Sequence, residues 1–212
     1  MASPKRPILK GLVAVGAGLV LVIPVLVFGQ KKPHPAPVSE VPPKARGAES
    51  AALEILEYSD FQCPACSSVQ IYLKKLLEEH PGEIRLVFRH YPLQRHRNAP
   101  LAHQAAECAH DQGNFWAYHD RLYSEQDSWA EDHEPARRML QYARDLGLNL
   151  EQFSGCLENL EVTDRIKIEL TEGKAQGVSS TPSFFIQSKM AVGEKQLREA
   201  VDGWVRDRAK NP

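Results

Sequence analysis

The sequence predicts an α/β domain that carries a helical insertion and is preceded by one transmembrane helix. Three observations support this prediction. An uncharged, mostly apolar segment lies near the N-terminus. Strand and helix patterns alternate over residues 53–88 and again over residues 183–205, and the residues between these two stretches show helical spacing alone.

The composition is that of a folded protein, with 42% hydrophobic and 25% charged residues among 212. These values exclude a disordered, collagenous or multi-pass membrane chain. The first 32 residues hold five bases and no acid, so the remaining residues carry 21 bases against 27 acids. This acidic body argues against nucleic-acid binding, because phosphate groups are bound by clustered Lys and Arg.

Residues 11–29 are 19 consecutive uncharged residues. As a helix they would span roughly 29 Å, about the thickness of a hydrocarbon core. A cleaved signal peptide is the alternative, but its apolar region usually runs for only about 7–15 residues and ends in a small-residue cleavage site. We therefore predict an uncleaved anchor. A slight excess of positive charge before it places residues 1–10 in the cytoplasm and the rest of the chain outside.

Residues 30–50 are predicted to be a stiff Pro-rich linker, because proline favours extended conformations. Its prolines are Pro33, Pro35, Pro37, Pro42 and Pro43. The folded domain is predicted over residues 51–210, a length that suits one hydrophobic core.

Apolar side chains at Leu53, Ile55, Leu56 and Tyr58 predict a buried strand directly before a helix. Pro64 is expected one residue into that helix, where its missing N–H would have had no partner. Helical spacing continues as far as residues 80–82, which end the helix, and alternation over 84–88 predicts a second strand.

Residues 98–174 follow a helical pattern throughout. Further apolar runs predict a third strand over 183–186, a short fourth strand over 190–192 and a last helix over 197–205. Breaks in the long helical stretch are predicted at Gly113, Pro135, Gly147 and Gly155.

The residues with the clearest chemistry are Cys63 and Cys66, a C-x-x-C motif that starts the first helix. The partial positive charge and free N–H groups of a helix N-terminus favour the thiolate of Cys63, which we expect to be the exposed sulfur. Cys66 lies one turn later, turned toward the protein, where it can resolve a mixed disulfide. A zinc half-site is the alternative, but a structural zinc site usually needs a second ligand pair.

Three segments, residues 56–66, 112–120 and 177–186, together resemble the DsbA-like thioredoxin-fold thiol-disulfide oxidoreductases, in particular their membrane-tethered, BdbD-like members. The resemblance implies a mixed four-stranded thioredoxin sheet between helices, with the helical insertion at about residues 98–157. Many strongly oxidising members have His where this chain has Ala65. We therefore expect stabilisation of the Cys63 thiolate to persist but to be weaker.

The resemblance also implies roles for residues outside the motif. Thr181 and Pro182 match a cis-proline loop that faces the cysteines and pairs with an extended substrate, although an ordinary loop proline is the alternative. Glu57 matches an acid beneath the active site that moves protons to or from the buried cysteine, the alternative being a solvated strand residue. Asp60 is placed nearer the surface and left without a role. The histidines are expected to be structural or solvated: His90, His96, His103, His110 and His119.

Cys108 and Cys156 lie 48 positions apart on apolar helical faces. Some DsbA-like members have a second disulfide within the insertion, so the resemblance implies a structural Cys108–Cys156 bond here. Two buried free thiols are the alternative.

Function follows from the same resemblance. It implies an extracytoplasmic thiol-disulfide oxidoreductase that introduces disulfides into exported proteins through Cys63 and Cys66. Reduced or unfolded exported proteins would be its substrates, and a DsbB- or VKOR-type membrane protein would reoxidise it. We expect a monomer without cofactor or metal, anchored in the bacterial inner or cell membrane with its catalytic domain on the periplasmic side. A reductase or isomerase with the same cysteines, or a metal-binding or copper-delivery module, are the alternatives.

Overall fold

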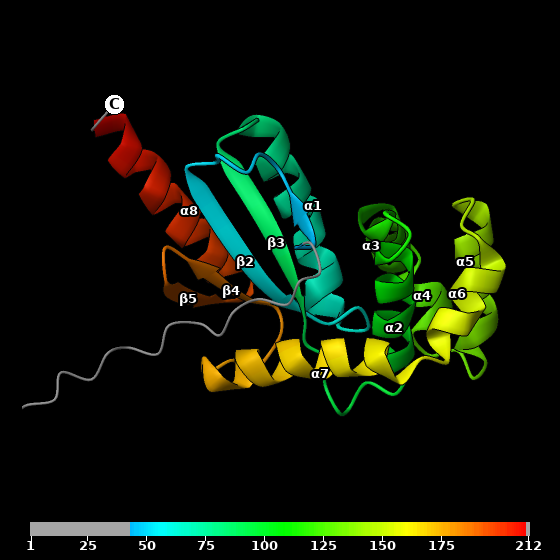
Figure 1. The fold of residues 1–212 in the computed structure, drawn as a ribbon. Helices are drawn as coiled ribbons and strands as arrows, with labels where there is room; N and C mark the ends of the chain where they lie inside the picture. The colour runs from blue at the N-terminus through cyan, green and yellow to red at the C-terminus, as the bar shows by residue number, and fades with distance from the viewer. Residues whose placement is uncertain (1–42, 211–212) are drawn as a thin grey trace, which may run out of the picture. The chain divides into compact units, whose positions relative to one another are not determined.

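Strand β2 (Leu53–Ser59) is the centre of the sheet, and its side chains alternate between two covered faces. In the computed structural model, which describes residues 43–210, β2 pairs in parallel with β3 (Ile84–His90) and antiparallel with β4 (Ser183–Ile186) (Figure 1). Strand β5 (Lys189–Val192) extends the sheet beyond β4, and β1 (Ala45–Arg46) extends it beyond β3. The sheet is therefore mixed, as the family resemblance implies.

Strand β1 is a fifth strand that the sequence did not predict, and it lies within the stretch predicted to be a linker. Its Ala45 pairs with Val87 of β3. The preceding Lys44 is buried, and its ammonium group lies 2.6 Å from a Glu107 carboxylate oxygen and 2.7 Å from one of Glu169. These ion pairs with residues far along the chain hold residues 44–46 against the domain.

Helices cover both faces of the sheet. On one face, α1 (Pro64–Glu79) and α8 (Gly193–Lys210) pack on the side of Leu53 and Ile55. On the other face, α7 (Leu160–Ala175) lies against the side of Tyr58. Gly173 allows this close approach, because a Cβ there would lie 2.8 Å from the Tyr58 ring.

Helix α1 begins and ends where the sequence predicts. Cys63 is its N-cap, Pro64 is its first residue, and His80 is its C-cap. Gly82 follows with φ of +76°, a left-handed conformation that favours glycine. The apolar face of α1 lies in the same cluster as the strand residues Leu53 and Ile55.

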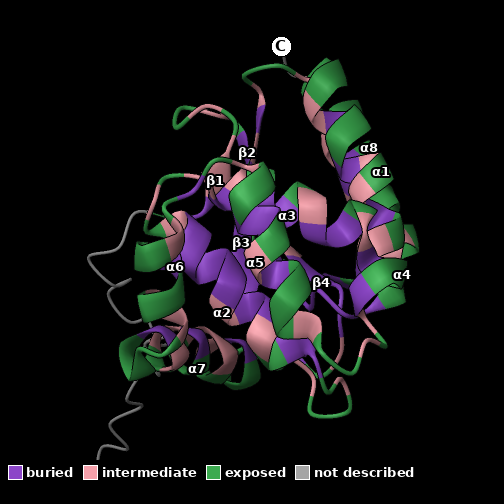
Figure 2. Ribbon diagram, turned by 90° about the vertical axis from the view of Figure 1, so that its right-hand side faces the viewer, coloured by how far each residue is buried: buried purple, intermediate pink, exposed green. Residues whose placement is uncertain are grey.

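The insertion contains five helices between β3 and α7: α2 (Ala99–His110), α3 (Phe115–Ser124), α4 (Gln126–Trp129), α5 (Pro135–Asp145) and α6 (Leu150–Leu157). They gather beside the N-terminal end of α1 (Figure 1). Helix α2 is largely buried among them (Figure 2), because its small alanine side chains let its neighbours approach closely.

The predicted break at Gly155 is wrong, because Gly155 lies inside α6. A glycine costs a helix only about 1 kcal/mol, and here the Asn149 side chain caps the helix by accepting a hydrogen bond from the Gln152 N–H. The buried Phe153 ring also fixes α6 against the rest of the insertion. Local propensity is therefore outweighed by capping and packing.

Two of the histidines meet in a buried polar cluster. His90 Nε2 lies 2.7 Å from a carboxylate oxygen of Glu107, and His90 Nδ1 lies 2.6 Å from His103 Nδ1. Arg165 of α7 also contacts Glu107, at 3.0 Å. With Lys44, the cluster links β1, β3, α2 and α7, which supports a structural role for these two histidines.

The predicted membrane anchor over residues 11–29 and the cytoplasmic segment 1–10 lie outside the described residues. Over residues 43–210, none of the helices combines the length and apolar character needed to span a membrane.

Candidate dithiol active site

The two C-x-x-C sulfurs lie at the N-terminus of α1, where β2 passes into the helix. Both cysteines are free thiols in the structure. Cys63 exposes 4% of its surface and Cys66 exposes none. Cys63 is therefore the more accessible of the two, but it is buried and not the exposed sulfur that the sequence predicts.

The two thiols have opposite ionisation properties. A hydrogen bond from the Cys66 thiol lowers the pKa of Cys63 to about 5, with smaller contributions from the backbone N–H groups of Cys66 and Ala65, and together these outweigh burial. Burial raises the pKa of Cys66 well above its ordinary value, and the neighbouring Cys63 raises it further. Near neutral pH the site therefore holds a thiolate at Cys63 and a thiol at Cys66.

The loop before β4 faces this pair. The Thr181–Pro182 peptide bond is cis, and the Cys63 sulfur lies 3.6 Å from the Thr181 carbonyl oxygen. A hydrogen bond from the thiol to this carbonyl is possible only while Cys63 keeps its proton. Once ionised, the sulfur is stabilised instead by the Cys66 thiol and the helix N–H groups. The structure thus brings Thr181 beside the cysteine pair, although the two segments are 118 residues apart.

Glu57 is fully buried on β2, so it is not a solvated strand residue. Burial raises the pKa of its carboxyl to about 7, against weaker opposing hydrogen bonds from Ser59 and Gln70. The Gln70 side-chain amide donates to one carboxyl oxygen at 2.9 Å, and the other oxygen has no hydrogen-bond partner within residues 43–210. Such a carboxyl can take up or release a proton near neutrality.

Ser59 and Tyr123 also belong to the buried surroundings of Cys66, and the sequence reasoning missed both. Their hydroxyl oxygens lie 2.9 Å apart, and both side chains are buried. Ser59 could have been found locally, because it is a polar residue two positions after Glu57 on a buried strand. No local signal existed for Tyr123, which lies 64 residues further along the chain.

Asp60 anchors the active-site turn, so its predicted place nearer the surface is wrong. It is fully buried. Its carboxylate accepts hydrogen bonds from the backbone N–H of Gln62 and of Leu93, each at 2.7 Å, and from His96 at 2.8 Å. These bonds satisfy the buried charge and hold the turn that leads into Cys63.

The insertion holds the same turn from the other side. The Gln126 side chain of α4 donates to the backbone carbonyls of Phe61, at 2.7 Å, and of Cys63, at 3.1 Å. The Gln62 side chain donates to the Ala130 carbonyl at 2.6 Å. The helical insertion is therefore a part of the site's framework.

Cys108 and Cys156 form a disulfide with an S–S distance of 2.02 Å, which joins α2 to α6. This bond lies within the insertion, and its sulfurs are not available as ligands beside Cys63 and Cys66. Among the residues from 43 to 210, no group of three or more His, Cys, Asp or Glu side chains is placed to hold a metal ion.

Fold and site together define the class of protein: a DsbA-like thioredoxin fold with the dithiol centre of a thiol-disulfide oxidoreductase. The comparisons with known proteins agree. Residues 39–206 match the family model described as Thioredoxin, and the chain belongs to this family. The resemblance drawn from the sequence is therefore confirmed.

Solved structures share the fold over most of the chain. A thioredoxin-like oxidoreductase from Silicibacter pomeroyi DSS-3 is 27% identical, with a TM-score of 0.65 over 76% of this chain and 91% of that one. BdbD from Bacillus subtilis in its oxidised form is 15% identical, with a TM-score of 0.69 over 80% and 94% of the two chains. Wolbachia pipientis α-DsbA1 is 22% identical, with a TM-score of 0.66 over 76% and 87%.

Curated relatives match over a similar stretch. The Na(+)/H(+) antiporter NhaA of Herminiimonas arsenicoxydans is 32% identical over 153 residues, which are 72% of this chain and 24% of the antiporter. NhaA 3 of Salinispora tropica is 36% identical over 145 residues, 68% of this chain and 21% of that protein. The chain thus spans less than a quarter of the length of these relatives.

Proposed function

We propose that this protein is an extracytoplasmic thiol-disulfide oxidase that transfers the Cys63–Cys66 disulfide to exported proteins. One observation carries the proposal: the two sulfurs are held in opposite protonation states, with the pKa of Cys63 lowered to about 5 by the Cys66 thiol and the pKa of Cys66 raised by burial. This asymmetry is what sequential disulfide exchange requires, because one sulfur must leave readily and the other must stay inside the protein.

The exchange proceeds in two balanced steps. A substrate thiolate attacks the Cys63 sulfur, the Cys63–Cys66 bond breaks, and the electron pair leaves on Cys66, which takes up a proton. A second substrate thiolate then attacks the substrate sulfur bound to Cys63, and Cys63 leaves as a thiolate. The substrate gains one disulfide and the enzyme is left as a dithiol.

The direction of transfer follows from which form of the enzyme is stabilised. The hydrogen bonds that lower the pKa of Cys63 act on its thiolate, which exists only in the reduced enzyme. Stabilising the reduced form makes the disulfide a stronger oxidant. This supports oxidation of substrates over their reduction.

The loop at Thr181 supports substrate binding. Its carbonyl lies 3.6 Å from the Cys63 sulfur, so a peptide that reaches this sulfur passes along the backbone of residues 181 and 182. We propose that an extended substrate segment pairs with this backbone as an added strand, which selects unfolded polypeptides over folded ones.

The proposed function also needs a place for the protein in the cell and a partner that reoxidises its dithiol. We propose that residues 11–29 anchor the protein in the bacterial inner or cell membrane, with the dithiol site on the periplasmic side. Two relatives that match over this stretch are Na(+)/H(+) antiporters, and this supports a membrane setting. A DsbB- or VKOR-type membrane protein would then reoxidise the dithiol, and confinement of both partners to one membrane would raise their encounter rate.

The test uses the full chain in detergent, oxidised at Cys63 and Cys66 and mixed with reduced, unfolded ribonuclease A. We expect one substrate disulfide for each enzyme disulfide consumed, no transfer by Cys63→Ser, and normal transfer by the control variant that lacks both Cys108 and Cys156. Equilibration with glutathione measures the reduction potential of the Cys63–Cys66 pair, which determines the direction of disulfide transfer. A potential nearer about −120 mV is expected, whereas one near about −270 mV, with insulin reduction and no ribonuclease oxidation, would show that the protein is a reductase.

A further inference from the structure

We propose that His103 is a positioning residue for the dithiol site. Its neutral ring, protonated at Nδ1, accepts a hydrogen bond at Nε2 from the backbone N–H of Phe61 and so holds the turn that leads into Cys63. This inference rests on the proposed function, because the turn carries the pair of cysteines that exchanges disulfides.

The contact between His103 and the turn lies in the protein interior. Phe61 and His103 are both fully buried, so the backbone N–H of Phe61 needs an acceptor within the protein. The Nε2 atom of His103 lies 3.4 Å from this backbone nitrogen. The two rings also pack against each other, with their centroids 4.8 Å apart. A ring nitrogen of α2 is therefore an acceptor for the active-site turn.

The other nitrogen of His103 continues a chain of hydrogen bonds. His103 Nδ1 lies 2.6 Å from His90 Nδ1, and His90 Nε2 lies 2.7 Å from a carboxylate oxygen of Glu107. His90 and Glu107 are fully buried as well. Three consecutive contacts thus join the backbone of the turn to a buried carboxylate.

The carboxylate of Glu107 fixes one end of this chain. The Lys44 ammonium group lies 2.6 Å from the oxygen that contacts His90, and Arg165 lies 3.0 Å from the other oxygen. Two cations keep the carboxylate ionised, and an ionised carboxylate accepts hydrogen bonds but has none to donate. The Nε2 atom of His90 must therefore carry a proton.

The two ends together determine where the protons lie. The backbone N–H of Phe61 only donates, the Glu107 carboxylate only accepts, and a neutral imidazole has one donor and one acceptor nitrogen. All three contacts are satisfied when His103 donates from Nδ1 to His90 and His90 donates from Nε2 to Glu107. Burial, together with the charge of Lys44, lowers the pKa of His90 to about 4, so this ring is neutral near pH 7.

Asp60 is the other charged group that faces His103. Its carboxylate oxygen lies 3.8 Å from His103 Nε2, which is too far for a hydrogen bond. This carboxylate already accepts hydrogen bonds from two backbone N–H groups and from His96. With a proton on Nε2, His103 would turn a donor toward the Phe61 N–H in place of a lone pair. The opposite tautomer would therefore release the turn.

One peptide group connects His103 to Cys63. The N–H of Phe61 and the carbonyl of Asp60 belong to the same peptide group, and this carbonyl accepts a hydrogen bond from the Cys63 N–H at 3.0 Å. The position of that planar group thus sets the position of Cys63 at the start of α1. Because the Cys66 thiol and the helix N–H groups lower the pKa of Cys63, a displaced turn should raise this pKa.

The first test determines the tautomer directly. The reduced full chain, labelled with nitrogen-15 in its histidines, is measured in detergent at pH 7 by NMR spectra that correlate ring nitrogens with carbon-bound ring protons. Protonated and unprotonated ring nitrogens resonate in different ranges, so each tautomer has its own pattern. We expect a proton on Nδ1 of His103 and on Nε2 of His90. The signals of His103 are assigned by their loss in His103→Gln.

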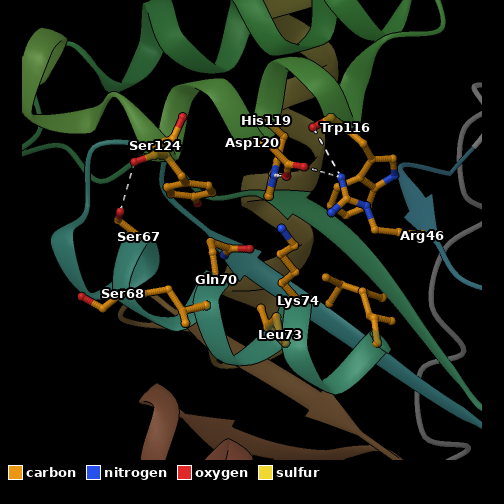
Figure 3. Close-up of a pocket in the computed structure, with 14 residues that line it drawn as sticks. Arg46, Ser67, Ser68, Gln70, Leu73, Lys74, Trp116, His119, Asp120 and Ser124 are labelled. Carbon is orange, nitrogen blue, oxygen red and sulfur yellow. Dashed lines mark hydrogen bonds and ion pairs between the residues drawn. The ribbon is translucent and has the colours of Figure 1, made fainter. Parts of the chain in front are cut away.

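The second test compares two buried histidines that both pack on Phe61. His119 exposes 1% of its surface, and its ring centroid lies 5.7 Å from that of Phe61. Its Nδ1 lies 2.8 Å from Asp120, and Figure 3 shows both residues on α3 at the groove that faces α1. His119→Phe therefore changes packing around Phe61 but keeps the acceptor at His103. It is the matched control for His103→Phe.

The readout is the pH at which the rate of Cys63 alkylation by iodoacetamide is half-maximal. His103→Phe should raise this midpoint by about half to one pH unit, the size expected for the loss of one neutral hydrogen bond. His103→Gln should shift the midpoint less, because an amide can accept from Phe61 and donate to His90. His119→Phe should match the wild type.

A proton on Nε2 of His103 at pH 7 would overturn the proposal. So would an unchanged midpoint in His103→Phe, or an equal shift in His119→Phe, which would mean that packing around the Phe61 ring is what matters. If His103→Phe does not fold, the wild-type tautomer still decides. Each of these outcomes leaves the proposed function intact, whereas a wild type that transfers no disulfide to reduced ribonuclease A would contradict the proposed function itself.

Discussion

The pKa of Cys63 leads to a prediction about how its reactivity depends on pH. The Cys66 thiol and the helix N–H groups lower this pKa from 9.0 to about 5. At pH 7 the thiolate fraction therefore rises from about 1% to about 99%. The intrinsic nucleophilicity of a thiolate falls with its pKa, by roughly 40- to 100-fold over such a shift. At pH 7 the larger thiolate fraction and the lower nucleophilicity nearly cancel in the alkylation rate of Cys63. A rate measured at a single pH therefore does not report the pKa.

The informative quantity is the pH at which the alkylation rate is half-maximal. With iodoacetamide and peptide mass spectrometry, we expect the rate at Cys63 to be constant above about pH 6 and to fall tenfold per unit well below pH 5. Cys66→Ala should move the midpoint to higher pH, because it removes the largest stabilising hydrogen bond. Cys66→Ser keeps a donor and should shift it less. A wild-type midpoint near pH 9, or an unchanged midpoint in Cys66→Ala, would refute the reasoning.

Two further predictions concern stability. Replacing both Cys108 and Cys156 by Ser opens a loop with a sequence separation of 48, and the chain-entropy account gives a loss of about 4 kcal/mol in the free energy of unfolding, measurable by urea titration. Dithiol exchange should survive, and its loss in a folded variant would contradict a purely structural role. Glu107→Gln should cost about 3 kcal/mol or more at pH 7, because it leaves the buried Lys44 with one fewer carboxylate. Hydrogen bonds from His90 and Lys44, together with the charge of Lys44, outweigh burial and lower the pKa of Glu107. The ionised Glu107 carboxylate therefore stabilises the fold fully above about pH 4.3, and this stabilisation is lost as the pH falls further. The difference in the free energy of unfolding between the wild type and Glu107→Gln should narrow in acid. A difference that stays constant would contradict the ion-pair explanation.

The parts of the fold that the sequence predicted are those encoded over short distances. The strand before Cys63, the helix that starts at Pro64 and the two strands near the C-terminus all carry local patterns of apolar spacing and turn residues. The position of Cys63 at a helix N-terminus follows from the same patterns. The proximity of Cys63 to Thr181 does not follow from local patterns. It was predicted because the three segments resemble a known family.

The parts that were missed depend on residues distant in sequence. Lys44 lies in a Pro-rich stretch and looks solvated, yet its partners Glu107 and Glu169 come 63 and 125 residues later. Asp60 looks like a surface acid, yet the backbone N–H groups that satisfy its carboxylate exist only once the turn has formed. Burial of a polar residue is determined by where its partners are, and a single sequence does not state that.

Ala65 shows how the site keeps a reactive sulfur without a histidine between the two cysteines. The sequence predicts weaker thiolate stabilisation, because Ala65 has no imidazole to offer. In the structure, a hydrogen bond from the Cys66 thiol is the largest contribution that lowers the pKa of Cys63, and backbone N–H groups add to it. These donors depend on the backbone at residues 61–66, and Gln126 of the insertion holds the carbonyls of Phe61 and Cys63 in that turn. The reactivity of Cys63 therefore depends on the insertion as well as on the motif, and substitutions at Gln126 should affect the pKa of Cys63 even though its side chain does not contact the sulfur.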